Sequence, residues 1–403
     1  MKILLFIENI SPGGMDTFCE NLINFWPVNS DKFFLVVNKS HPGISYLGKN
    51  IHNKNCKILE LDIPLSWMYV RKISNFLPYQ FAALFGPVFR IILYFVQKSI
   101  LKNFFVDNSA DCLISISGGF PGGESNRIAN IVWKELGLKR NIYNFHNLAQ
   151  KPRFGLKKIE SFLDSRLDNS VDKYIGVSGP CIDSVKIRDY SFNPDKFLFI
   201  HNGVKVKENS NNIDLRNFCG LKENHFICLV LGTLEGRKGH KFIIDACKNL
   251  FSNTEINLVI VGSGSDKQIK KLRKIISNSG HSEKIHFLGY ISNAANLIKQ
   301  ADLLLIGSQE YESFGLTAIE AMQFGIPIVS TDVGGLPEVI GKSFSSGILC
   351  PNNDKELYSQ AIYNLYSNKE LYKQIQKNSV ERYISMFTPE VMTNKYLEVI
   401  RKI

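Results

Sequence analysis

Residues 303–329 read LLLIGSQEYESFGLTAIEAMQFGIPIV, and this stretch decides the fold. It begins with an apolar run, 303–306, passes through a polar loop and a helical segment, and ends in a second apolar run, 326–329. Short runs that are apolar throughout are typical of parallel strands covered on both faces. The stretch therefore predicts a strand, a loop, a helix and a second parallel strand.

Two carboxylates, Glu312 and Glu320, lie in this loop and helix. A fully helical segment rises ~1.5 Å per residue, which would separate them by roughly 12 Å. That is wider than the spacing of about 5 to 9.5 Å of a glycosidase carboxylate pair. We therefore expect them to hold different parts of one elongated ligand. Between them, a helix start capped by Ser313 offers free amides and a positive dipole end to a phosphate group.

The same strand and helix pattern recurs along the whole chain. A polar stretch, 205–212, separates two series of apolar runs, and a chain of 403 residues suits two domains. Strands that alternate with helices predict two doubly wound parallel sheets, whose ligands bind at the carboxyl ends of the strands. The expected strands are 3–7, 33–37, 113–116, 142–145, 174–177 and 198–200, then 227–231, 258–261, 285–288, 303–306 and 326–329.

Composition limits the class of protein. Apolar content of 44% and charged content of 21% are near the averages of soluble globular proteins, which excludes a disordered or fibrous chain. The eight cysteines form no C-x-x-C pair, so we expect reduced core thiols in a cytosolic protein. The apolar run 3–7 is too short for a signal peptide. A net charge of +11 favours anionic partners.

The segment 63–106 is basic and aromatic, and it contains no acidic residue. Its uncharged part, 77–89, is interrupted by Pro78 and Pro87, so it falls short of the ~20 apolar residues of a spanning helix. Two interpretations remain open: an amphipathic helix packed on its own domain's sheet with solvated basic side chains, or a helix on an anionic membrane surface. The basic residues are Arg71, Lys72, Arg90, Lys98 and Lys102.

Other loops that follow strands carry candidate binding residues. Residues 232–239 read GTLEGRKG, in which Arg237 and Lys238 form a possible clamp for a diphosphate that gains charge as it departs. The strand 258–261 runs into Gly262-Ser263-Gly264-Ser265, which is not a G-x-G-x-x-G fingerprint because no third glycine follows in register.

Three features of the first half admit two interpretations each. Gly13 and Gly14 follow the first strand and form either a close approach to a ligand or an ordinary tight turn, with Gly13 the better candidate for the approach. His146 ends the strand 142–145, where it is either a ligand contact or a satisfied structural histidine. Lys151, Arg153, Lys157 and Lys158 either meet an anionic acceptor or form a solvated loop.

The pattern E-S-F-G-L-x-x-x-E-A-M from Glu312, followed by G-I-P-I-V up to Val329, resembles the donor-site signature of retaining GT-B glycosyltransferases of the family-four (group 1) type. The loop 232–239 is similar to that family's G-R-L-x-x-x-K-G loop, with Thr233 at the usual arginine position. Further similar segments are 11–16, 177–178, 201–204, 258–265 and 331–338.

The resemblance implies an α/β fold of GT-B architecture, with two Rossmann-like doubly wound domains facing a central cleft. Residues 1–204 would form the acceptor-side domain, 205–384 the nucleotide-sugar domain, and 385–403 a helix that returns to the first domain. It implies catalytic roles for His146, Glu312 and Lys238, and donor binding by Gly13, Gly14, Arg237, Lys238, Gly262, Ser313, Phe314, Gly315, Leu316 and Glu320.

The implied activity is retaining transfer of a sugar from a nucleoside diphosphate sugar to a hydroxyl of a glycan or lipid-linked acceptor, in cell-surface polysaccharide synthesis. The implied site needs no metal and no cofactor, and the protein would be cytoplasmic or peripheral on the inner face of the membrane. The alternatives are a catalytically inactive GT-B binding subunit and a nucleotide-sugar epimerase. Nucleic acid is excluded as a partner because the basic residues form no recognised module.

Overall fold

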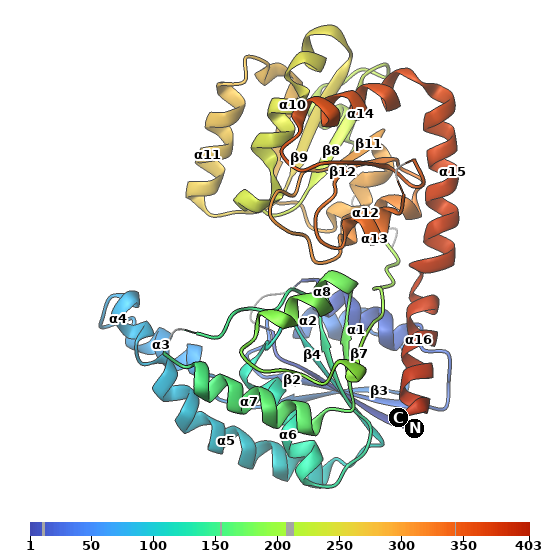
Figure 1. Cartoon of the computed structure of the whole chain (residues 1–403). Coiled ribbons are helices and arrows are strands. Elements are labelled where there is room, and N and C mark those ends of the chain that lie inside the picture. The colour runs from blue at the N-terminus through green and yellow to red at the C-terminus, as the bar shows by residue number, and fades with distance from the viewer. Residues whose placement is uncertain (10–12, 154, 207–212, 343) are drawn as a thin grey trace. The chain divides into compact units, whose positions relative to one another are not determined.

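The computed structural model describes residues 1–9, 13–153, 155–206, 213–342 and 344–403. The chain divides into two compact units, shown in Figure 1. Unit 1 comprises Met1–Gly203 and Pro389–Ile403, and unit 2 comprises Val204–Thr388. Ser11 and Pro12 of the first glycine loop, and most of the polar stretch 205–212, lie outside the described residues.

Unit 1 contains a parallel sheet of seven strands in the order β3-β2-β1-β4-β5-β6-β7. The strands are β1 Lys2–Ile7, β2 Lys32–Asn38, β3 Cys56–Leu61, β4 Cys112–Ser117, β5 Asn141–Phe145, β6 Lys173–Gly176 and β7 Phe197–Phe199. The α-helices are α1 Gly14–Asn24, α2 Ile44–Asn50, α3 Ser66–Ile73, α4 Tyr79–Ala83, α5 Gly86–Asp107, α6 Glu124–Glu135, α7 Lys157–Ser170, α8 Gly179–Asp183 and α16 Pro389–Lys402.

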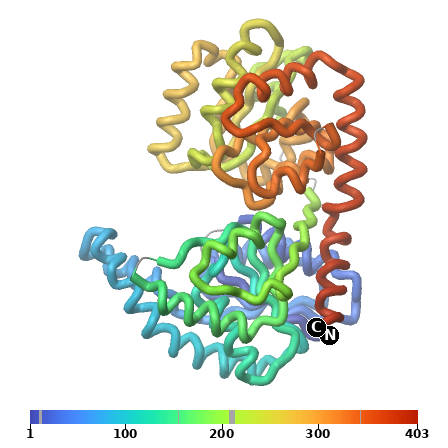
Figure 2. The backbone as a smooth tube through the Cα atoms, viewed as in Figure 1, coloured from blue at the N-terminus to red at the C-terminus, as the bar shows by residue number. Residues whose placement is uncertain are grey.

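Strand β1 shows why the strands of unit 1 are apolar throughout. Ile3 and Leu5 pack in a cluster with residues of α1 and α16, whereas Leu4 and Phe6 pack in a second cluster with residues of α5 and α6. Successive side chains of a strand point to opposite faces, so both faces of this sheet are covered. The backbone trace in Figure 2 carries the red C-terminal helix α16 beside the blue N-terminal strand.

Unit 2 contains a parallel sheet of six strands in the order β10-β9-β8-β11-β12-β13. The strands are β8 Phe226–Leu231, β9 Ile256–Val261, β10 Ile285–Gly289, β11 Leu303–Ile306, β12 Ile328–Thr331 and β13 Ile348–Cys350. The α-helices are α9 Leu215–Cys219, α10 His240–Asn253, α11 Asp266–Ser277, α12 Leu316–Gln323, α13 Leu336–Ile340, α14 Lys355–Ser367 and α15 Lys369–Met386.

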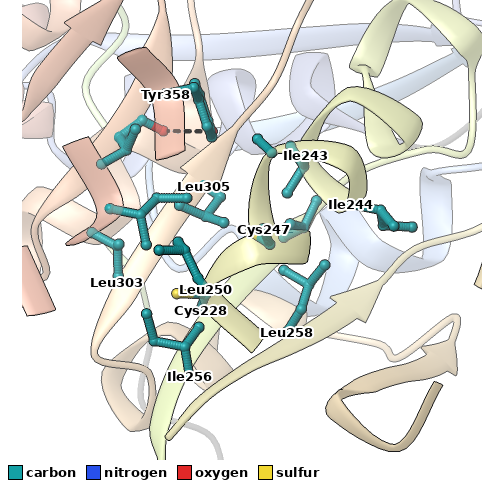
Figure 3. Close-up of a cluster of buried hydrophobic side chains, with 14 of the residues drawn as sticks. Cys228, Ile243, Ile244, Cys247, Leu250, Ile256, Leu258, Leu303, Leu305 and Tyr358 are labelled. Atoms are coloured by element: carbon teal, nitrogen blue, oxygen red, sulfur yellow. Dashed lines mark hydrogen bonds between the residues drawn. The ribbon is translucent and has the colours of Figure 1, made fainter. Parts of the chain in front are cut away.

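The core of unit 2 packs β8, β9 and β11 against α10 and α14, as Figure 3 shows. Tyr358 is buried there, and its hydroxyl donates to the carbonyl of Val329 at 3.0 Å. Cys228 and Cys247 belong to the same cluster, and burial raises the pKa of the Cys247 thiol to about 12. All eight cysteines are free thiols, and six of them are buried. They serve here as small apolar core residues.

The basic, aromatic segment 63–106 contains helices α3 and α4 and most of α5. Leu101 and Phe105, in the second half of α5, pack in the cluster that covers the sheet. Its first half exposes apolar side chains, among them Ile92 and Phe95. Among the described residues, no helix is both long and apolar enough to cross a membrane.

Candidate functional site

The loops after β8 and β11 meet where the strand order of unit 2 reverses. Strand β8 lies between β9 and β11, and the chain continues from β8 to β9 on one side before it returns to β11 on the other. In doubly wound sheets, ligands bind outside the carboxyl ends of the strands at such a switch point. The first loop ends in the short 3₁₀ helix η3, Gly236–Lys238, and the second leads to α12.

An ion pair joins these two loops. Lys238 Nζ contacts Glu312 Oε2, which also accepts from Ser308 Oγ at 3.2 Å and lies 3.8 Å from Arg237 Nη1. The Glu312 side chain is largely buried. The fold therefore brings together three of the residues predicted for the site, Arg237, Lys238 and Glu312. Lys238 and Glu312 are 74 residues apart along the chain.

Arg237 is held from three directions. Glu235 accepts from Arg237 Nε at 2.6 Å, the guanidinium lies 4.9 Å from the centre of the Tyr311 ring, and the Arg237 carbonyl accepts from the backbone of Gln309 at 2.8 Å. Thr233, which stands at the arginine position of the similar loop, donates from its hydroxyl to Glu235 at 2.8 Å. No local sequence pattern indicates Glu235 and Tyr311, because their contacts with Arg237 depend on how the two loops fold together.

Two glycines allow the backbones of these loops to touch. Gly239 has φ +69°, and a Cβ there would lie 1.8 Å from the carbonyl oxygen of Gly307. A Cβ on Gly262 would lie 1.8 Å from the carbonyl oxygen of Gly232. The glycine predicted at position 262 is thus required by the packing of the β9 loop on the β8 loop.

The start of α12 corrects one prediction. Ser313 is not the N-cap; the cap is Gly315, which has φ +101° and no side chain that accepts from the first turn. The helical rise therefore applies only from Leu316 onward, and the separation of roughly 12 Å estimated for Glu312 and Glu320 on a full helix does not hold. The Phe314 ring is buried beside Phe387, at 6.2 Å between centroids.

Glu320 is half-buried on α12, and no described residue donates a hydrogen bond to its carboxylate. Burial raises the pKa of Glu320 to about 7. A half-buried carboxylate with no donor among these residues is open to hydrogen bonds from solvent or from a ligand.

The remaining predicted residues belong to unit 1. Gly13 is the N-cap of α1, Gly14 is its first residue, and a Cβ on Gly13 would meet no atom within 4 Å. The Gly13 amide donates at 3.0 Å to Asp16, which is buried against His41 Nε2 at 2.9 Å. His41 could not be predicted from the sequence, because it lies 25 residues from Asp16 and no local pattern connects the two.

His146 follows β5 and packs edge-on against Phe18, with ring centroids 4.5 Å apart. Asn202 Nδ2 lies 3.4 Å from His146 Nδ1, and Nε2 is shielded from solvent without a hydrogen-bond partner in the described part of the chain. Burial lowers the pKa of His146 to about 3, so the ring is neutral at pH 7. Among the described residues, no group of three or more His, Cys, Asp or Glu side chains has metal-binding geometry.

Comparisons with known proteins agree with this fold. Residues 211–382 match the family model of glycosyl transferases group 1. N-acetyl-alpha-D-glucosaminyl L-malate synthase of Bacillus anthracis is 28% identical over 182 residues, which are 45% of this chain and 47% of that protein. The chain spans about half the length of the curated relatives it matches.

Solved structures match over the whole chain. A glycosyltransferase from Rickettsia africae ESF-5 has a TM-score of 0.77 at 18% identity and covers 100% of this chain and 98% of its own. Anabaena Alr3699/HepE in complex with UDP has a TM-score of 0.75 at 16% identity and covers 100% of both chains. The chain therefore has the GT-B fold. Most of its second unit matches the glycosyl transferases group 1 family model.

Proposed function

We propose that this chain is a retaining glycosyltransferase, which transfers a sugar from a nucleoside diphosphate sugar to a hydroxyl of a glycan or lipid-linked acceptor. The observation that carries the proposal is the Lys238–Glu312 pair at the switch point of unit 2. A relative of the same fold, Anabaena Alr3699/HepE, was solved with UDP, which supports a nucleotide donor for this chain.

The donor would be held along the α12 loop. Glu320, to which none of the described residues donates, would accept hydrogen bonds from the ribose hydroxyls. As the family resemblance implies, Phe314, Gly315 and Leu316 at the start of α12 would contact the diphosphate, and the N-cap Gly315 has no side chain that accepts from the first turn. Glu312 would orient the hydroxyls of the transferred sugar once Lys238 turns toward the phosphates.

The reaction breaks the bond between the anomeric carbon and the diphosphate oxygen, and forms a bond from that carbon to the acceptor oxygen on the same face. The acceptor proton passes to the leaving diphosphate, so no side chain acts as nucleophile. Lys238 and Arg237 would neutralise the charge that develops on the diphosphate. The neutral His146 ring would position the sugar by a hydrogen bond.

The proposal includes a metal-independent site, because Arg237 and Lys238 supply positive charge at the diphosphate. We expect the rate of transfer to change less than about twofold when EDTA is added. A rate that falls with EDTA and recovers with a divalent cation would contradict this part of the proposal.

The first experiment is a thermal-shift screen of the purified chain with UDP-, GDP- and ADP-sugars, followed by an NMR assay with the sugar that binds. Retention predicts a product with the anomeric configuration of the donor. Release of free or epimerised sugar at the full rate without any acceptor would instead identify a hydrolase or epimerase. Binding without turnover in the presence of an acceptor panel would favour an inactive subunit.

A further inference from the structure

Unit 1 contains two adjacent cavities that have no part in the donor site proposed above. A polar cavity of about 420 Å³ is lined by Glu8 at the end of β1, by the β4–α6 loop 118–124, and by Lys151 and Arg153 after β5. An apolar cavity of about 200 Å³ lies between α5 and α7. The two cavities are neighbours, and Arg90, Arg127 and Glu160 line both.

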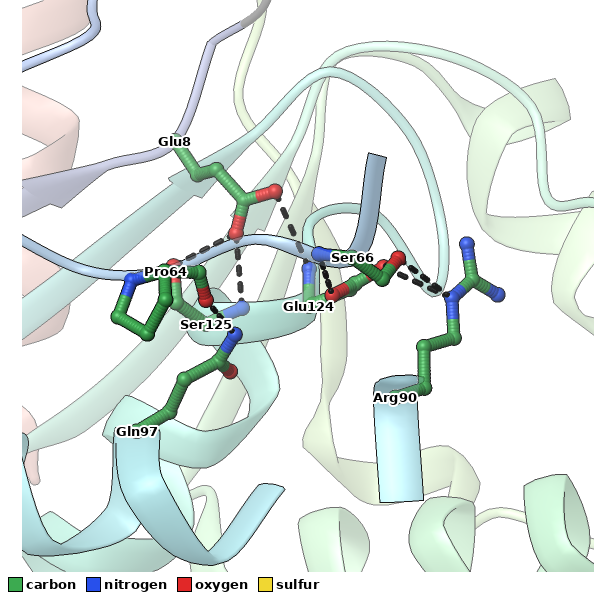
Figure 4. A network of polar contacts seen from close by, with 7 residues as sticks. All are labelled: Glu8, Pro64, Ser66, Arg90, Gln97, Glu124 and Ser125. Atoms are coloured by element: carbon green, nitrogen blue, oxygen red, sulfur yellow. Dashed lines mark hydrogen bonds and ion pairs between the residues drawn. The ribbon is translucent and has the colours of Figure 1, made fainter. Parts of the chain in front are cut away.

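Two carboxylates of the polar cavity already have donors, as Figure 4 shows. Glu8 accepts from the Ser125 backbone at 2.7 Å and from the Ser125 hydroxyl at 2.6 Å. It therefore occupies the start of α6, and burial raises the pKa of its carboxyl. Glu124 contacts Ser66 Oγ and accepts from Arg90 Nε at 2.7 Å.

The third carboxylate of the polar cavity, Glu160, is also neutralised by an arginine. Arg188 is buried and donates to Glu160 at 2.7 Å and to Asp164 at 2.8 Å. Lys151 and Arg153 are exposed at the cavity mouth, and neither forms an ion pair among the described residues. The positive charge that remains at this end is complementary to an anionic group.

The apolar cavity has the opposite character. Phe95 of α5 is 67% exposed and Phe162 of α7 is 59% exposed, and both line it together with Ile91 and Ile159. Burial of apolar surface is worth roughly 25 cal/mol per Å², so side chains exposed together in one groove indicate a binding surface. An apolar groove of this kind is complementary to a hydrocarbon chain.

We propose that the two cavities together bind an amphiphilic acceptor, with its anionic, hydroxyl-bearing head in the polar cavity and its hydrocarbon chain in the groove between α5 and α7. That this ligand is an acceptor rests on the proposed function. The inference narrows the class of acceptor from a glycan or lipid-linked molecule to a membrane-derived lipid. The two cavities share Arg90 and Arg127 in their linings, and this adjacency favours one molecule with two ends.

The test measures binding of dodecyl phosphate to the full chain below the micelle-forming concentration, by calorimetry. Inorganic phosphate keeps the anion without the chain, and dodecyl maltoside keeps the chain with a neutral head. We expect dodecyl phosphate to bind at least about tenfold more tightly than either, because each comparison ligand lacks the contacts of one of the two cavities. Equal affinity for either comparison ligand would overturn the proposal.

Two variants test the two ends. Phe95→Asp with Phe162→Asp should weaken dodecyl phosphate binding by about tenfold or more, whereas Val106→Asp, on α5 but outside the groove and 63% exposed, should not. Lys151→Glu with Arg153→Glu should weaken it similarly, whereas Lys134→Glu with Lys139→Glu changes the net charge equally and should not. Unchanged binding in either test pair would contradict the proposed site.

A second measurement does not depend on any variant. A diazirine-bearing alkyl phosphate, photolysed with the unmodified chain, should label peptides of α5 and α7, and labelling confined to other helices would overturn the proposal. UDP binding is measured in parallel. A chain that binds dodecyl phosphate but no nucleotide or nucleotide sugar would remove the proposed function while leaving the amphiphile site in place.

Discussion

Lys238 contributes a positive charge that no neighbouring side chain can fully replace. Arg237 Nη1 is 3.8 Å from Glu312, too far for a hydrogen bond, so Lys238→Ala would leave Glu312 with a weaker partner. We expect Lys238→Ala to lower kcat/KM by about 100-fold or more, as removal of a group that stabilises developing charge does. The measurement is a steady-state transfer assay with the donor found by thermal shift.

The matched control for this prediction is Lys241→Ala. Lys241 is an exposed lysine on α10 that pairs with Asp245 at 2.5 Å, away from Glu312. Its loss should change kcat/KM by less than about twofold, since surface ion pairs contribute little. Equal losses in the two variants would show that the effect of Lys238 is not specific to its position.

Glu320 makes the stability of the ligand-free protein depend on pH. Its pKa is raised from 4.5 to about 7, so the folded chain binds more protons than the unfolded chain between these values. The free energy of unfolding therefore falls as pH rises through this window, and the destabilisation is complete above pH 7. Glu320→Gln should raise the free energy of unfolding by about 1–2 kcal/mol at pH 8 and leave it unchanged at pH 4.

The same variant should bind the nucleotide more weakly, which distinguishes a ligand contact from a purely structural effect. Denaturant unfolding at pH 4 and pH 8 and calorimetry with the nucleotide measure the two properties separately. Glu356→Gln, on the exposed surface of α14, should alter neither. The gain in unfolding free energy caused by Glu320→Gln should be larger at pH 8 than at pH 4. An equal gain at both pH values would contradict the raised pKa of Glu320.

Local sequence pattern predicted the positions of single residues but not their partners. That Lys238 and Glu312 belong to one site could be anticipated because both follow strands that end at one edge of a sheet, but their ion pair could not. Ser313 was wrong as a helix cap, because the glycine two residues later adopts φ +101° and starts the helix there. The pairing of Asp16 with His41 connects α1 to a loop after β2, and no periodicity of the sequence reports such a contact.

At the scale of elements, the loop after β8 depends on Gly239. An alanine there would require φ +69° and place its Cβ 1.8 Å from the Gly307 carbonyl oxygen, so the two loops would have to separate. We expect Gly239→Ala to destabilise unit 2 by about 3 kcal/mol or more and to abolish turnover. Thermal unfolding of the two proteins provides the measurement.

Gly236→Ala is the control for this substitution, because a Cβ at Gly236 meets no atom within 4 Å and its φ is not positive. It should leave the melting temperature within about 2 °C of the unmodified chain. A Gly239→Ala protein that melts at the same temperature as Gly236→Ala would show that the loops can pack without the close approach.

Most strands were predictable, including the edge strands β7 and β10, whereas the edge strands β3 and β13 were not. Each predicted run lies in or overlaps a strand of the structure, since continuous apolar residues satisfy two covering layers. Strand β3 was missed because it is an edge strand that mixes Lys57 and Glu60 with apolar residues. Strand β13 was missed because three residues, Ile348–Cys350, are too few for a periodic signal.

At the scale of the whole molecule, contact with an anionic membrane surface stays a prediction, which rests on the net charge of +11 and the exposed apolar side chains of α4 and α5. We expect the chain to co-float with vesicles that contain anionic lipid, but not with neutral vesicles, and to be released at high salt. Phe81→Asp with Leu84→Asp should reduce co-flotation, whereas Phe218→Asp, on exposed α9 of unit 2, should not. Equal co-flotation with neutral vesicles would contradict an electrostatic contribution.

Helix α16 closes unit 1 from a distant part of the chain. Met392 and Tyr396 pack with residues of β1, and the Tyr396 hydroxyl accepts from Asn144 Nδ2 at 2.8 Å. A ribosome makes α16 only after all of unit 2, at about 5–20 residues per second, so the first unit waits on the order of ten to forty seconds for its last helix. Unit 2, although synthesised later, can complete its fold first, and during that interval the apolar surface of unit 1 that α16 will cover is a natural target for chaperones.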